Sequence, residues 1–396
     1  MRKKNILVAQ GGGPTMVINQ SLVGVIEAAK TNNFNVYGAL NGVNGILNSK
    51  IISLSKLNSE KLSRVAITPS SILGSTRDKP DEKYCEEIFK VLKKRQIDKF
   101  FYIGGNDSSD TLRIISNKAS LKNYQLQCVH IPKTIDNDLV LNDHTPGFGS
   151  AAKYVASAFA GVSLDVSSLP GVYIGVVMGR HAGFLTAASG LLKEKDSEGP
   201  HLIYTPESVF KITKFLQDVK NVHLKFGKCV IAVSEGVHDE NKKLIAHYNL
   251  DHVEKDAHGN LQLSGISSLG DYLVKQIKEN LNIKRVRADT FGYLQRSFLG
   301  SVSEIDSKEA RILGKKSVLY SLKIRNSFSI CIEERKKFVS PYKIFFGINK
   351  LEDVGGKTKL MPKSFINKNQ NFVTNQFIKY ARPLIGNKIP KFISSI

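Results

Sequence analysis

The sequence predicts an α/β protein with mostly parallel sheets, and three observations lead to this prediction. Short apolar runs alternate along the chain with longer segments whose apolar residues recur at helical spacing. Several of the apolar runs are nearly continuous, which is typical of strands that are covered on both faces of a parallel sheet. Two glycine-rich loops and one polar segment directly follow three of these runs, and open α/β sheets bind ligands at such strand ends.

The predicted strands are short and apolar: Asn5–Gln10, Asn35–Leu40, Asp98–Ile103, Leu126–Ile131, Val172–Met178 and Lys228–Ser234. Helical spacing predicts helices at Met16–Ala29, Glu82–Lys94, Ser150–Leu164, Ser208–Val219, Ser268–Asn280 and Glu304–Ser321. Ser303 and Asp306 predict an N-terminal cap on the last of these helices. The polar segment His238–Leu263 interrupts the alternation and is interpreted as an exposed insertion. The residues after Ser340 are expected to pack as an extension.

Composition predicts a cytoplasmic enzyme with no membrane partner. A chain of 396 residues with 41% hydrophobic content can bury a full core, and two or three domains are expected. No apolar run approaches the length of about 20 residues that spans a membrane. The N-terminal apolar stretch is short and is interpreted as a first strand, not as a signal peptide. The four cysteines, with no CxxC spacing, are expected to be reduced thiols: Cys85, Cys128, Cys229 and Cys331.

The formal net charge of +22 is high for a metabolic enzyme and raises the possibility of a nucleic-acid partner. The basic residues are scattered, as at 93–95, 242–243, 315–316 and 335–337, without interleaved aromatic residues. A solvated, lysine-rich surface is therefore the preferred interpretation, and no nucleic-acid partner is expected. Such a surface would raise the local concentration of anionic substrates. A catalytically silent nucleic-acid-binding or regulatory protein would account for the charge, but not for the ordered carboxylates described next.

The segment Pro132–Asp138, PKTIDND, places one ammonium, one hydroxyl and two carboxylates behind a predicted strand. Phosphoryl transfer needs such a set. A carboxylate takes the proton of the attacking hydroxyl, a cation offsets the charge on the moving group, and polar groups hold the acceptor. A solvated Asp/Asn turn is the alternative interpretation of this segment.

Two further loops favour the phosphoryl-transfer interpretation. GGGPT at 11–15 stands between a predicted strand and a predicted helix, an arrangement that turns backbone N–H groups toward an anion. Its spacing is neither GxGxxG nor GxxxxGK[ST], which disfavours a Rossmann dinucleotide site and a P-loop. GGNDS at 104–108 also follows a predicted strand, and its Asn106 and Asp107 have oxygens that suit Mg²⁺. A turn capped by Asp107 is the alternative there.

Together these segments resemble the phosphofructokinase family, and the resemblance covers nearly the whole chain. The matching segments are GGGPT at 11–15, GSTR at 74–77, GGNDS at 104–108, PKTIDND at 132–138, MGRHAG at 178–183, SEG at 234–236 and RADTFGYLQRS at 287–297. The resemblance implies two Rossmann-like lobes, the phosphofructokinase fold, with the active site between the lobes. It assigns 1–145 to a phosphate-donor lobe with part of the sugar site and 146–300 to a fructose 6-phosphate lobe. Residues 301–396 would be a C-terminal helix and extension that pack back on both lobes.

The combination of motifs is similar to the pyrophosphate-dependent branch of that family. The implied reaction is reversible phosphoryl transfer from pyrophosphate to the 1-hydroxyl of fructose 6-phosphate, a step of glycolysis, with Mg²⁺ as cofactor. A homodimer or homotetramer is also implied. An ATP-dependent 6-phosphofructokinase is the nearest alternative. A lipid or NAD kinase with a GGDG-type loop is more distant, because it leaves PKTIDND, MGR and GYLQR unexplained.

Two residues favour pyrophosphate over ATP as the donor. ATP-using relatives typically have glycine where this chain has Asp107 and Lys133. A carboxylate at Asp107 would occupy the space of a nucleotide α-phosphate and repel its charge. Lys133 would place a positive charge beside the phosphoryl group in transfer.

The resemblance also implies a role for each matching residue. Asp136 is the expected base, with Lys133 and Asp107 as further catalytic residues, and Asn106 and Asp107 are the expected metal ligands. The diphosphate would contact Gly12, Gly13 and Arg77. The sugar phosphate would contact Thr134, Asp138, Met178, Gly179, Arg180, Glu235, Arg287, Tyr293 and Arg296, where guanidinium groups suit phosphate geometry.

Each of these residues also has a simpler interpretation. Arg77, Arg287 and Arg296 are alternatively surface ion-pair partners, Glu235 ends a strand, and Tyr293 only packs. The histidines lack the spacing of a zinc site. The chain departs from the family pattern in two places: residues 168–172 hold no cation where many relatives have one, and Asn106 stands where relatives often have Asp.

Overall fold

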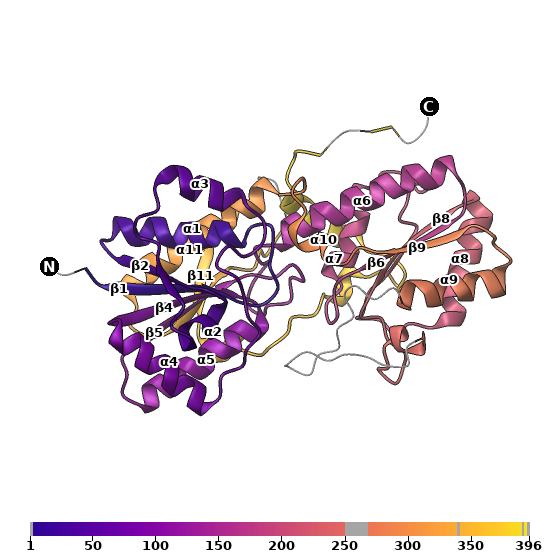
Figure 1. Ribbon diagram of the computed structural model, residues 1–396. Coiled ribbons are helices and arrows are strands. Elements are labelled where there is room, and N and C mark those ends of the chain that lie inside the picture. Colours follow the sequence, from indigo (N-terminus) through magenta and orange to yellow (C-terminus); the bar gives the residue numbers. More distant parts are fainter. Residues whose placement is uncertain (1–2, 250–267, 339–340, 390–391, 394–396) are drawn as a thin grey trace. The chain divides into compact units, whose positions relative to one another are not determined.

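The computed structural model describes residues 3–249, 268–338, 341–389 and 392–393 (Figure 1). The chain divides into two compact units, each built from several stretches. Unit 1 contains Met1–Ile135, Leu139–Phe148 and Arg296–Thr358, and unit 2 contains Asp136–Asp138, Gly149–Gln295 and Lys359–Ile396. The prediction divides the chain differently, into the contiguous ranges 1–145, 146–300 and 301–396. The compact units are discontinuous because residues after 295 complete the layers of unit 1 before the chain returns to unit 2.

The sheet of unit 1 has the strand order β11-β10-β5-β4-β1-β2-β3. Its inner strands run parallel, and the two edge pairings, β10 with β11 and β2 with β3, are antiparallel. The prediction of mostly parallel sheets is therefore confirmed. The strand bounds are β1 Asn5–Gln10, β2 Asn35–Ala39, β3 Ile51–Ser53, β4 Ile97–Gly104, β5 Gln127–Pro132, β10 Phe328–Ile332 and β11 Phe346–Asn349.

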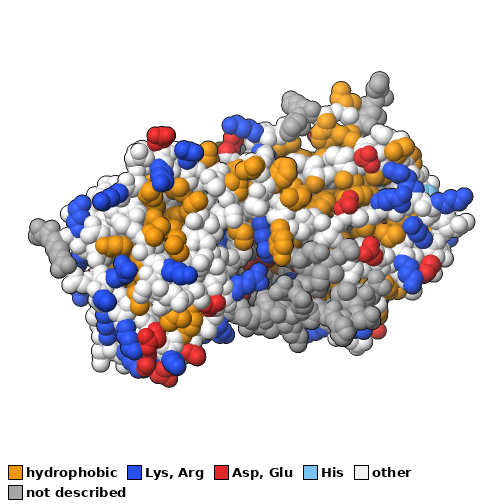
Figure 2. Space-filling model, viewed as in Figure 1, with side chains coloured by type: hydrophobic (Ala, Val, Ile, Leu, Met, Phe, Trp, Pro, Cys, Tyr) orange, Lys and Arg blue, Asp and Glu red, His pale blue; other side chains and the backbone are white. Residues whose placement is uncertain are grey.

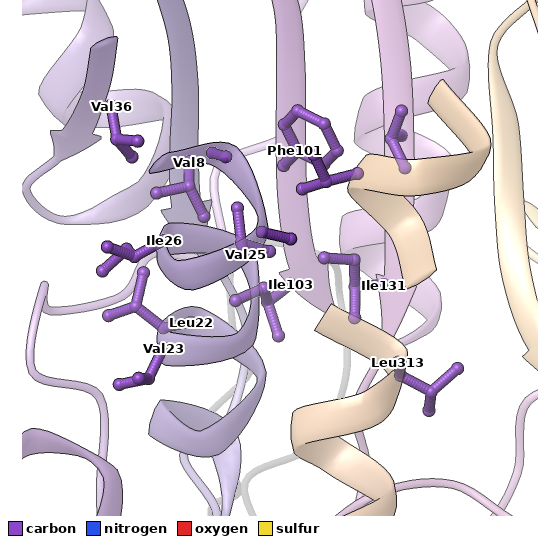
Figure 3. Close-up of a cluster of buried hydrophobic side chains, with 14 of the residues drawn as sticks. Val8, Leu22, Val23, Val25, Ile26, Val36, Phe101, Ile103, Ile131 and Leu313 are labelled. Carbon is purple, nitrogen blue, oxygen red and sulfur yellow. The ribbon is translucent and has the colours of Figure 1, made fainter. Parts of the chain in front are cut away.

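Helices cover both faces of this sheet (Figure 1). On one face lie α1 (Ile18–Thr31), α3 (Ser59–Ile67) and α11 (Glu304–Lys323). On the other face lie α2 (Gly42–Leu47), α4 (Glu82–Lys94), α5 (Asn106–Leu121) and the short α12 (Leu351–Val354). Figure 3 shows side chains of α1 and the strands, such as Ile26 and Val8, meeting in the buried cluster of the first face. Coverage on both faces explains the continuous apolar runs of the inner strands.

Helices α1 and α11 approach each other closely through glycine. A Cβ atom added to Gly24 would lie 2.3 Å from the carbonyl oxygen of Arg311, and one added to Gly314 would lie 2.1 Å from that of Ser21. Backbone atoms cannot move aside as a flexible side chain can. Both positions therefore require glycine, which has no side chain. This contact attaches residues after 303 to the first helix of the chain.

The sheet of unit 2 has the order β7-β8-β6-β9, and all of its pairings are parallel. The strands are β6 Val172–Val177, β7 Leu202–Tyr204, β8 Cys229–Ser234 and β9 Val286–Thr290. The helices are α6 Phe148–Ser168, α7 Phe184–Ala187, α8 Ile212–Phe226, α9 Ser268–Leu281, α10 Leu294–Ser297 and α13 Asn375–Ala381, with short 3-10 helices η1 Ala188–Leu192, η2 Ile245–Asn249, η3 Lys363–Phe365 and η4 Arg382–Ile385. Among the residues that the structure describes, no helix has the length and apolarity needed to span a membrane.

Several sequence predictions are confirmed and others are corrected. All six predicted strands are present, and Ser303 caps α11 by accepting a 3.4 Å hydrogen bond from the backbone N–H of Asp306. The helix predicted at Ser208–Val219 instead runs from Ile212 to Phe226, because left-handed Gly227 ends it. Helix α5 was not predicted, although it begins directly within the GGNDS motif.

The predicted exposed insertion at His238–Leu263 is confirmed only in part: residues 240–243 and Tyr248 are exposed, but the same segment also contributes to the core. Ile245 and Ala246 are buried against the core of unit 2. The remainder, from residue 250 onward, lies outside the described residues. The four cysteines are buried and unpaired by disulfides, as predicted. On the face drawn in Figure 2, Lys and Arg side chains are spread among acidic and neutral ones and form no single large patch.

Candidate active site

Three motif loops leave the same edge of the unit 1 sheet. The last residues of β1 and β4 pair as Gln10 with Ile103, and those of β4 and β5 pair as Gly104 with Pro132. Because these strands are parallel, the GGGPT, GGNDS and PKTIDND segments begin side by side at their carboxyl ends. This is the edge where open α/β sheets bind ligands.

The glycine turn at 11–13 is shaped by its surroundings. A Cβ atom on Gly11 would lie 2.4 Å from the Tyr102 hydroxyl oxygen, so a larger residue does not fit. Gly12 has φ of +73°, and its N–H donates to the carbonyl of Thr76 at 3.0 Å. The hydroxyl of Ser75 donates to the carbonyl of Gly12 at 2.6 Å. The GSTR segment therefore holds the turn on which the diphosphate is expected to bind.

Asp78, which the sequence analysis did not single out, holds the GSTR segment in turn. Its carboxylate accepts hydrogen bonds from Thr76 Oγ1 at 2.6 Å, Asn44 Nδ2 at 3.0 Å and the Tyr84 hydroxyl at 2.9 Å. Burial and this contact with Asp78 raise the pKa of Tyr84, so its hydroxyl stays a donor. The sequence offered one indication of this role: Asp78 directly follows the GSTR segment, two residues after Thr76 and next to the exposed Arg77.

Lys133 links two of the motif loops. Its side chain is 2% exposed, and Nζ donates to the carbonyl of Gly13 at 2.5 Å. Its backbone N–H donates to the carbonyl of Gly104 at 3.0 Å. A buried ammonium at the glycine turn places a fixed positive charge where an anion would bind.

Buried His130 supports the same strand ends in a neutral form. Its Nε2 lies 2.9 Å from the carbonyl of Gly104, and its Nδ1 lies 2.8 Å from the Ser329 hydroxyl. Burial lowers the pKa of His130, the hydrogen bond to the Gly104 carbonyl opposes this effect and nearby Lys133 adds to it, which together give a pKa of about 4.

Asn106 and Asp107 occupy the first turn of α5, with Gly105 as its N-cap. The interpretation of Asp107 as the cap of a turn is therefore replaced by a helix start. Helix N-termini attract negative charge, and the half-buried Asn106 and Asp107 add oxygen donors there. Among the described residues no group of three or more His, Cys, Asp or Glu side chains is arranged to hold a metal ion.

Thr134 is fixed by the loop that follows the motif. Its N–H donates to the carbonyl of Pro146 at 3.2 Å, and its own carbonyl accepts from Thr145 Oγ1 at 3.0 Å. The N–H of Gly147 donates to Asp306 Oδ1 at 2.8 Å, which ties this loop to α11.

A buried charged network anchors the same loop. His144 Nδ1 lies 2.7 Å from Asp143 Oδ2, and His144 Nε2 lies 2.7 Å from Glu309 Oε2. Arg335 Nε is 2.8 Å from Asp143 Oδ2, and the Tyr342 hydroxyl donates to Glu309 Oε1 at 2.6 Å. Burial lowers the pKa of His144, but the carboxylates of Glu309 and Asp143 together raise it to about 9. No spacing in the sequence indicated this network.

Arg296 lies in unit 1 beside the glycine turn. A Cβ atom on Gly13 would be 3.3 Å from the guanidinium carbon of Arg296. Unit 1 thus contains Gly12, Gly13, Arg77, Asn106, Asp107, Lys133, Thr134 and Arg296. Unit 1 therefore holds the donor-site candidates together with two residues that were predicted for the sugar phosphate, Thr134 and Arg296.

Unit 2 brings the MGR and SEG segments together at its own sheet edge. Val177 of β6 pairs with Ser234 of β8, so Met178 and Glu235 follow neighbouring strand ends. Ser234 Oγ donates to the carbonyl of Gly179 at 2.6 Å, and the N–H of Gly179 lies 3.5 Å from Glu235 Oε1. Met178 and Glu235 are buried, and the half-buried Arg180 follows Gly179, which has φ of +136°.

The carboxylates of PKTIDND, Asp136 and Asp138, also belong to unit 2. Burial and the neighbouring Arg180 lower the pKa of His181, while the Asp136 carboxylate opposes this effect. Asp136 therefore lies near the MGRH loop. The backbone N–H of Lys359 donates to the carbonyl of Asp138 at 2.7 Å.

Arg287 does not lie at the sheet edge where the MGR and SEG segments meet, and Tyr293 is largely exposed. Arg287 pairs with Tyr173, near the start of β6, whereas the MGR segment follows its end. The Arg287 side chain is exposed on the edge strand β9, and Tyr293 is 58% exposed. Exposure argues against the interpretation that Tyr293 only packs.

Comparison with known proteins gives one consistent family. The phosphofructokinase family model matches residues 5–320. A pyrophosphate–fructose 6-phosphate 1-phosphotransferase of Rhodospirillum rubrum is 56% identical over 98% of this chain and 96% of its own length. One of Xanthomonas campestris is 37% identical over 98% of this chain and 93% of its own. The crystal structure of a pyrophosphate-dependent phosphofructokinase from Marinobacter aquaeolei superposes with a TM-score of 0.85 at 32% identity, covering 98% of this chain and 94% of that one. This chain belongs to the phosphofructokinase family.

Proposed function

We propose that this protein transfers a phosphoryl group reversibly from pyrophosphate to the 1-hydroxyl of fructose 6-phosphate. The products are fructose 1,6-bisphosphate and phosphate. The observation that carries the proposal is the buried ammonium of Lys133, held on the carbonyl of Gly13 at the glycine turn. Relatives named for pyrophosphate that align over nearly the whole chain support the same donor.

The proposed transfer divides the work among named groups. Asp136 accepts the proton of the 1-hydroxyl group of fructose 6-phosphate while the hydroxyl oxygen attacks a phosphorus atom of pyrophosphate. The bond from that phosphorus to the bridging oxygen breaks, and phosphate leaves with the bridging electrons. Lys133 offsets the negative charge on the group in transfer, and the N–H groups of the glycine turn orient the donor.

Mg²⁺ is the proposed cofactor, with Asn106 and Asp107 as its protein ligands at the start of α5. An ion at this position would neutralise charge on the phosphate oxygens. Mg²⁺ commonly binds through one or two carboxylates together with substrate phosphates, so a small protein donor set is sufficient.

The acceptor is proposed to bind through the unit 2 loops. Met178, Gly179, Arg180 and Glu235 follow the neighbouring ends of β6 and β8, and Asp138 and Thr134 are proposed to flank the base. Arg287 and Tyr293 stay proposed ligands of the 6-phosphate. The position of Arg296 beside Gly13 favours a contact with the donor phosphates over its predicted contact with the 6-phosphate. We also propose a cytoplasmic homodimer or homotetramer.

Donor choice is tested with two substitutions. Two unit charges about 4 Å apart interact by about 4 kcal/mol at an effective dielectric constant of 20, which is enough to set donor preference by orders of magnitude. Asp107→Gly should raise kcat/KM for ATP relative to pyrophosphate, because it removes bulk and like charge at the start of α5. Lys133→Gly should mainly lower the pyrophosphate rate.

The measurement is kcat/KM for both donors in the parent and in both variants, with fructose 6-phosphate as acceptor. The exposed Lys79→Gly, in the loop before α4, is a matched control for loss of a lysine, and its donor ratio should equal that of the parent. A parent that prefers ATP, or an unchanged donor ratio in Asp107→Gly, would show that the ATP-dependent alternative or another donor determinant is correct.

A further inference from the structure

The chain continues beyond the part that the family model matches. That match ends at residue 320, and residues from Lys359 onward return to unit 2. We call the described residues 359–389 the C-terminal segment. Its residues Met361, Phe365, Phe377 and Tyr380 are buried, so the segment is packed into unit 2 and does not lie loosely on its surface.

The C-terminal segment contacts the PKTIDND motif at two consecutive residues. Asn137 Nδ2 donates to the hydroxyl oxygen of Tyr380 at 2.7 Å, and the backbone N–H of Lys359 donates to the carbonyl of Asp138 at 2.7 Å. Asn137 is fully buried, and it stands between the two carboxylates of the motif. The residue next to the proposed base is therefore held by a side chain that lies 243 positions later in the chain.

The backbone at Asn137 makes this contact important for Asp136. Asn137 has φ of +59°, a left-handed conformation that only glycine adopts without strain and that Asn tolerates better than most residues. A hydrogen bond on its side chain fixes this strained turn from outside. Release of the bond would let the turn relax and would reorient the carboxylate of the preceding residue.

Tyr380 is itself held rigidly. Its ring lies 5.2 Å from that of Phe365, 6.1 Å from that of Phe184 and 6.2 Å from that of Phe377, measured between centroids. Phe184 opens helix α7 directly after the MGRHAG segment. The same aromatic cluster therefore supports both the loop that carries Asp136 and the loop that carries Arg180.

Glu207 makes a second bridge between the C-terminal segment and the MGRHAG segment. Its Oε1 accepts from the N–H of Gly183 at 2.8 Å and from the N–H of Met361 at 3.0 Å. Both contacts lie within unit 2, as do those of Tyr380. The C-terminal segment is thus attached to both loops by backbone and side-chain hydrogen bonds.

We propose that Tyr380 is a positioning residue for phosphoryl transfer: through its hydrogen bond with Asn137 it fixes the turn that aims the Asp136 carboxylate at the acceptor hydroxyl. This inference rests on the proposed role of Asp136. A misplacement of a reacting group by about 1 Å costs roughly 10²-fold in rate, so the loss of one such bond should be visible in kcat.

The first experiment compares Tyr380→Phe with Tyr204→Phe in the full-length protein. Tyr204 is a matched control, because it is also buried and its hydroxyl also takes part in a side-chain hydrogen bond within unit 2, which it donates to Asp218 at 2.9 Å. Tyr380→Phe should lower kcat roughly 10- to 100-fold while KM for pyrophosphate stays within about twofold. Tyr204→Phe should lower the melting temperature at least as much as Tyr380→Phe does, but its kcat should stay close to that of the parent.

A double-mutant cycle with Asn137→Gly tests the route of the effect. Glycine accepts the left-handed backbone but removes the amide, so it should lower kcat as Tyr380→Phe does. If both act through one hydrogen bond, the double variant should be no slower than the slower single variant. Multiplying effects, or a parent-like kcat in Tyr380→Phe, would overturn the proposal.

Hydrogen exchange keeps the proposal testable independently of activity. Backbone amides in peptides that cover residues 132–141 should exchange faster in Tyr380→Phe than in the parent, and at the parent rate in Tyr204→Phe. Unchanged exchange there would overturn the positioning role even if kcat fell. A parent that has no pyrophosphate activity would refute the proposed function instead, while faster exchange would still establish the contact between Tyr380 and the loop.

Discussion

The buried His144 network makes the stability of unit 1 depend on pH in a defined direction. His144 is 2% exposed and lies 2.7 Å from a carboxylate oxygen on each side, Asp143 and Glu309. Arg335 pairs with Asp143, and the Tyr342 hydroxyl donates to Glu309. The network therefore contains two cations, two carboxylates and a neutral phenol, and the imidazole is held in its protonated form.

The sign follows from the two pKa values of His144, 6.5 as its ordinary value and about 9 in the folded protein. The folded state binds the proton more tightly, so the contribution to stability is fully present below pH 6.5. It is lost progressively as pH rises through about 9. The difference between the two values corresponds to a free energy on the order of 3 kcal/mol.

The assay is urea unfolding of the parent and of His144→Gln between pH 6 and pH 9.5. Glutamine keeps a polar side chain of similar reach but cannot titrate. The difference between their unfolding midpoints should be largest near pH 6 and shrink toward pH 9.5. Taking the difference between the two proteins removes the contribution of other groups that titrate in this range. One of these is the buried Lys193, because burial lowers its pKa to about 8.

His201→Gln is the control, because burial lowers the pKa of His201 to about 4. Its profile should diverge from that of the parent only as pH falls below 6.5, the opposite direction. Parallel profiles for the parent and His144→Gln from pH 6 to pH 9.5 would refute the assignment of a protonated, paired His144.

Four further outcomes are expected. Asp136→Asn should lower kcat by roughly 10²- to 10⁴-fold with little change in KM, measured by steady-state kinetics; near-parental turnover would exclude it as the base. Gly314→Ala should destabilise the protein by about 1–3 kcal/mol, because the new Cβ would meet the Ser21 carbonyl oxygen at 2.1 Å. Gly161→Ala on α6, where nothing lies within 4 Å, should be neutral or stabilising in the same denaturation assay. Binding to random duplex DNA, followed by fluorescence anisotropy, should vanish between about 50 and 200 mM salt; salt-resistant binding would favour a nucleic-acid partner.

The sequence determined the local elements and the identity of the motif loops. Six strands were predictable because burial on both faces requires continuous apolar residues, a pattern that is local in the chain. The glycine turn and PKTIDND were recognisable because each directly follows a predicted strand. In each motif the residues that form the turn or carry the reactive side chains stand at a fixed spacing from that strand. The prediction Ser208–Val219 differs from α8, Ile212–Phe226, because the helix continues as far as the left-handed Gly227 that ends it.

Only the tertiary structure decided which distant side chains support those loops. His144 meets Glu309 across 165 positions and Asn137 meets Tyr380 across 243, and neither pair leaves a periodic signal in the sequence. The position of Arg296 was also decided by packing. Its motif assigned it to the sugar phosphate, but in the structure it lies beside Gly13. A local pattern records what one segment needs for its own burial. The partners of a buried polar group are set instead by how separate segments pack, which no single segment encodes.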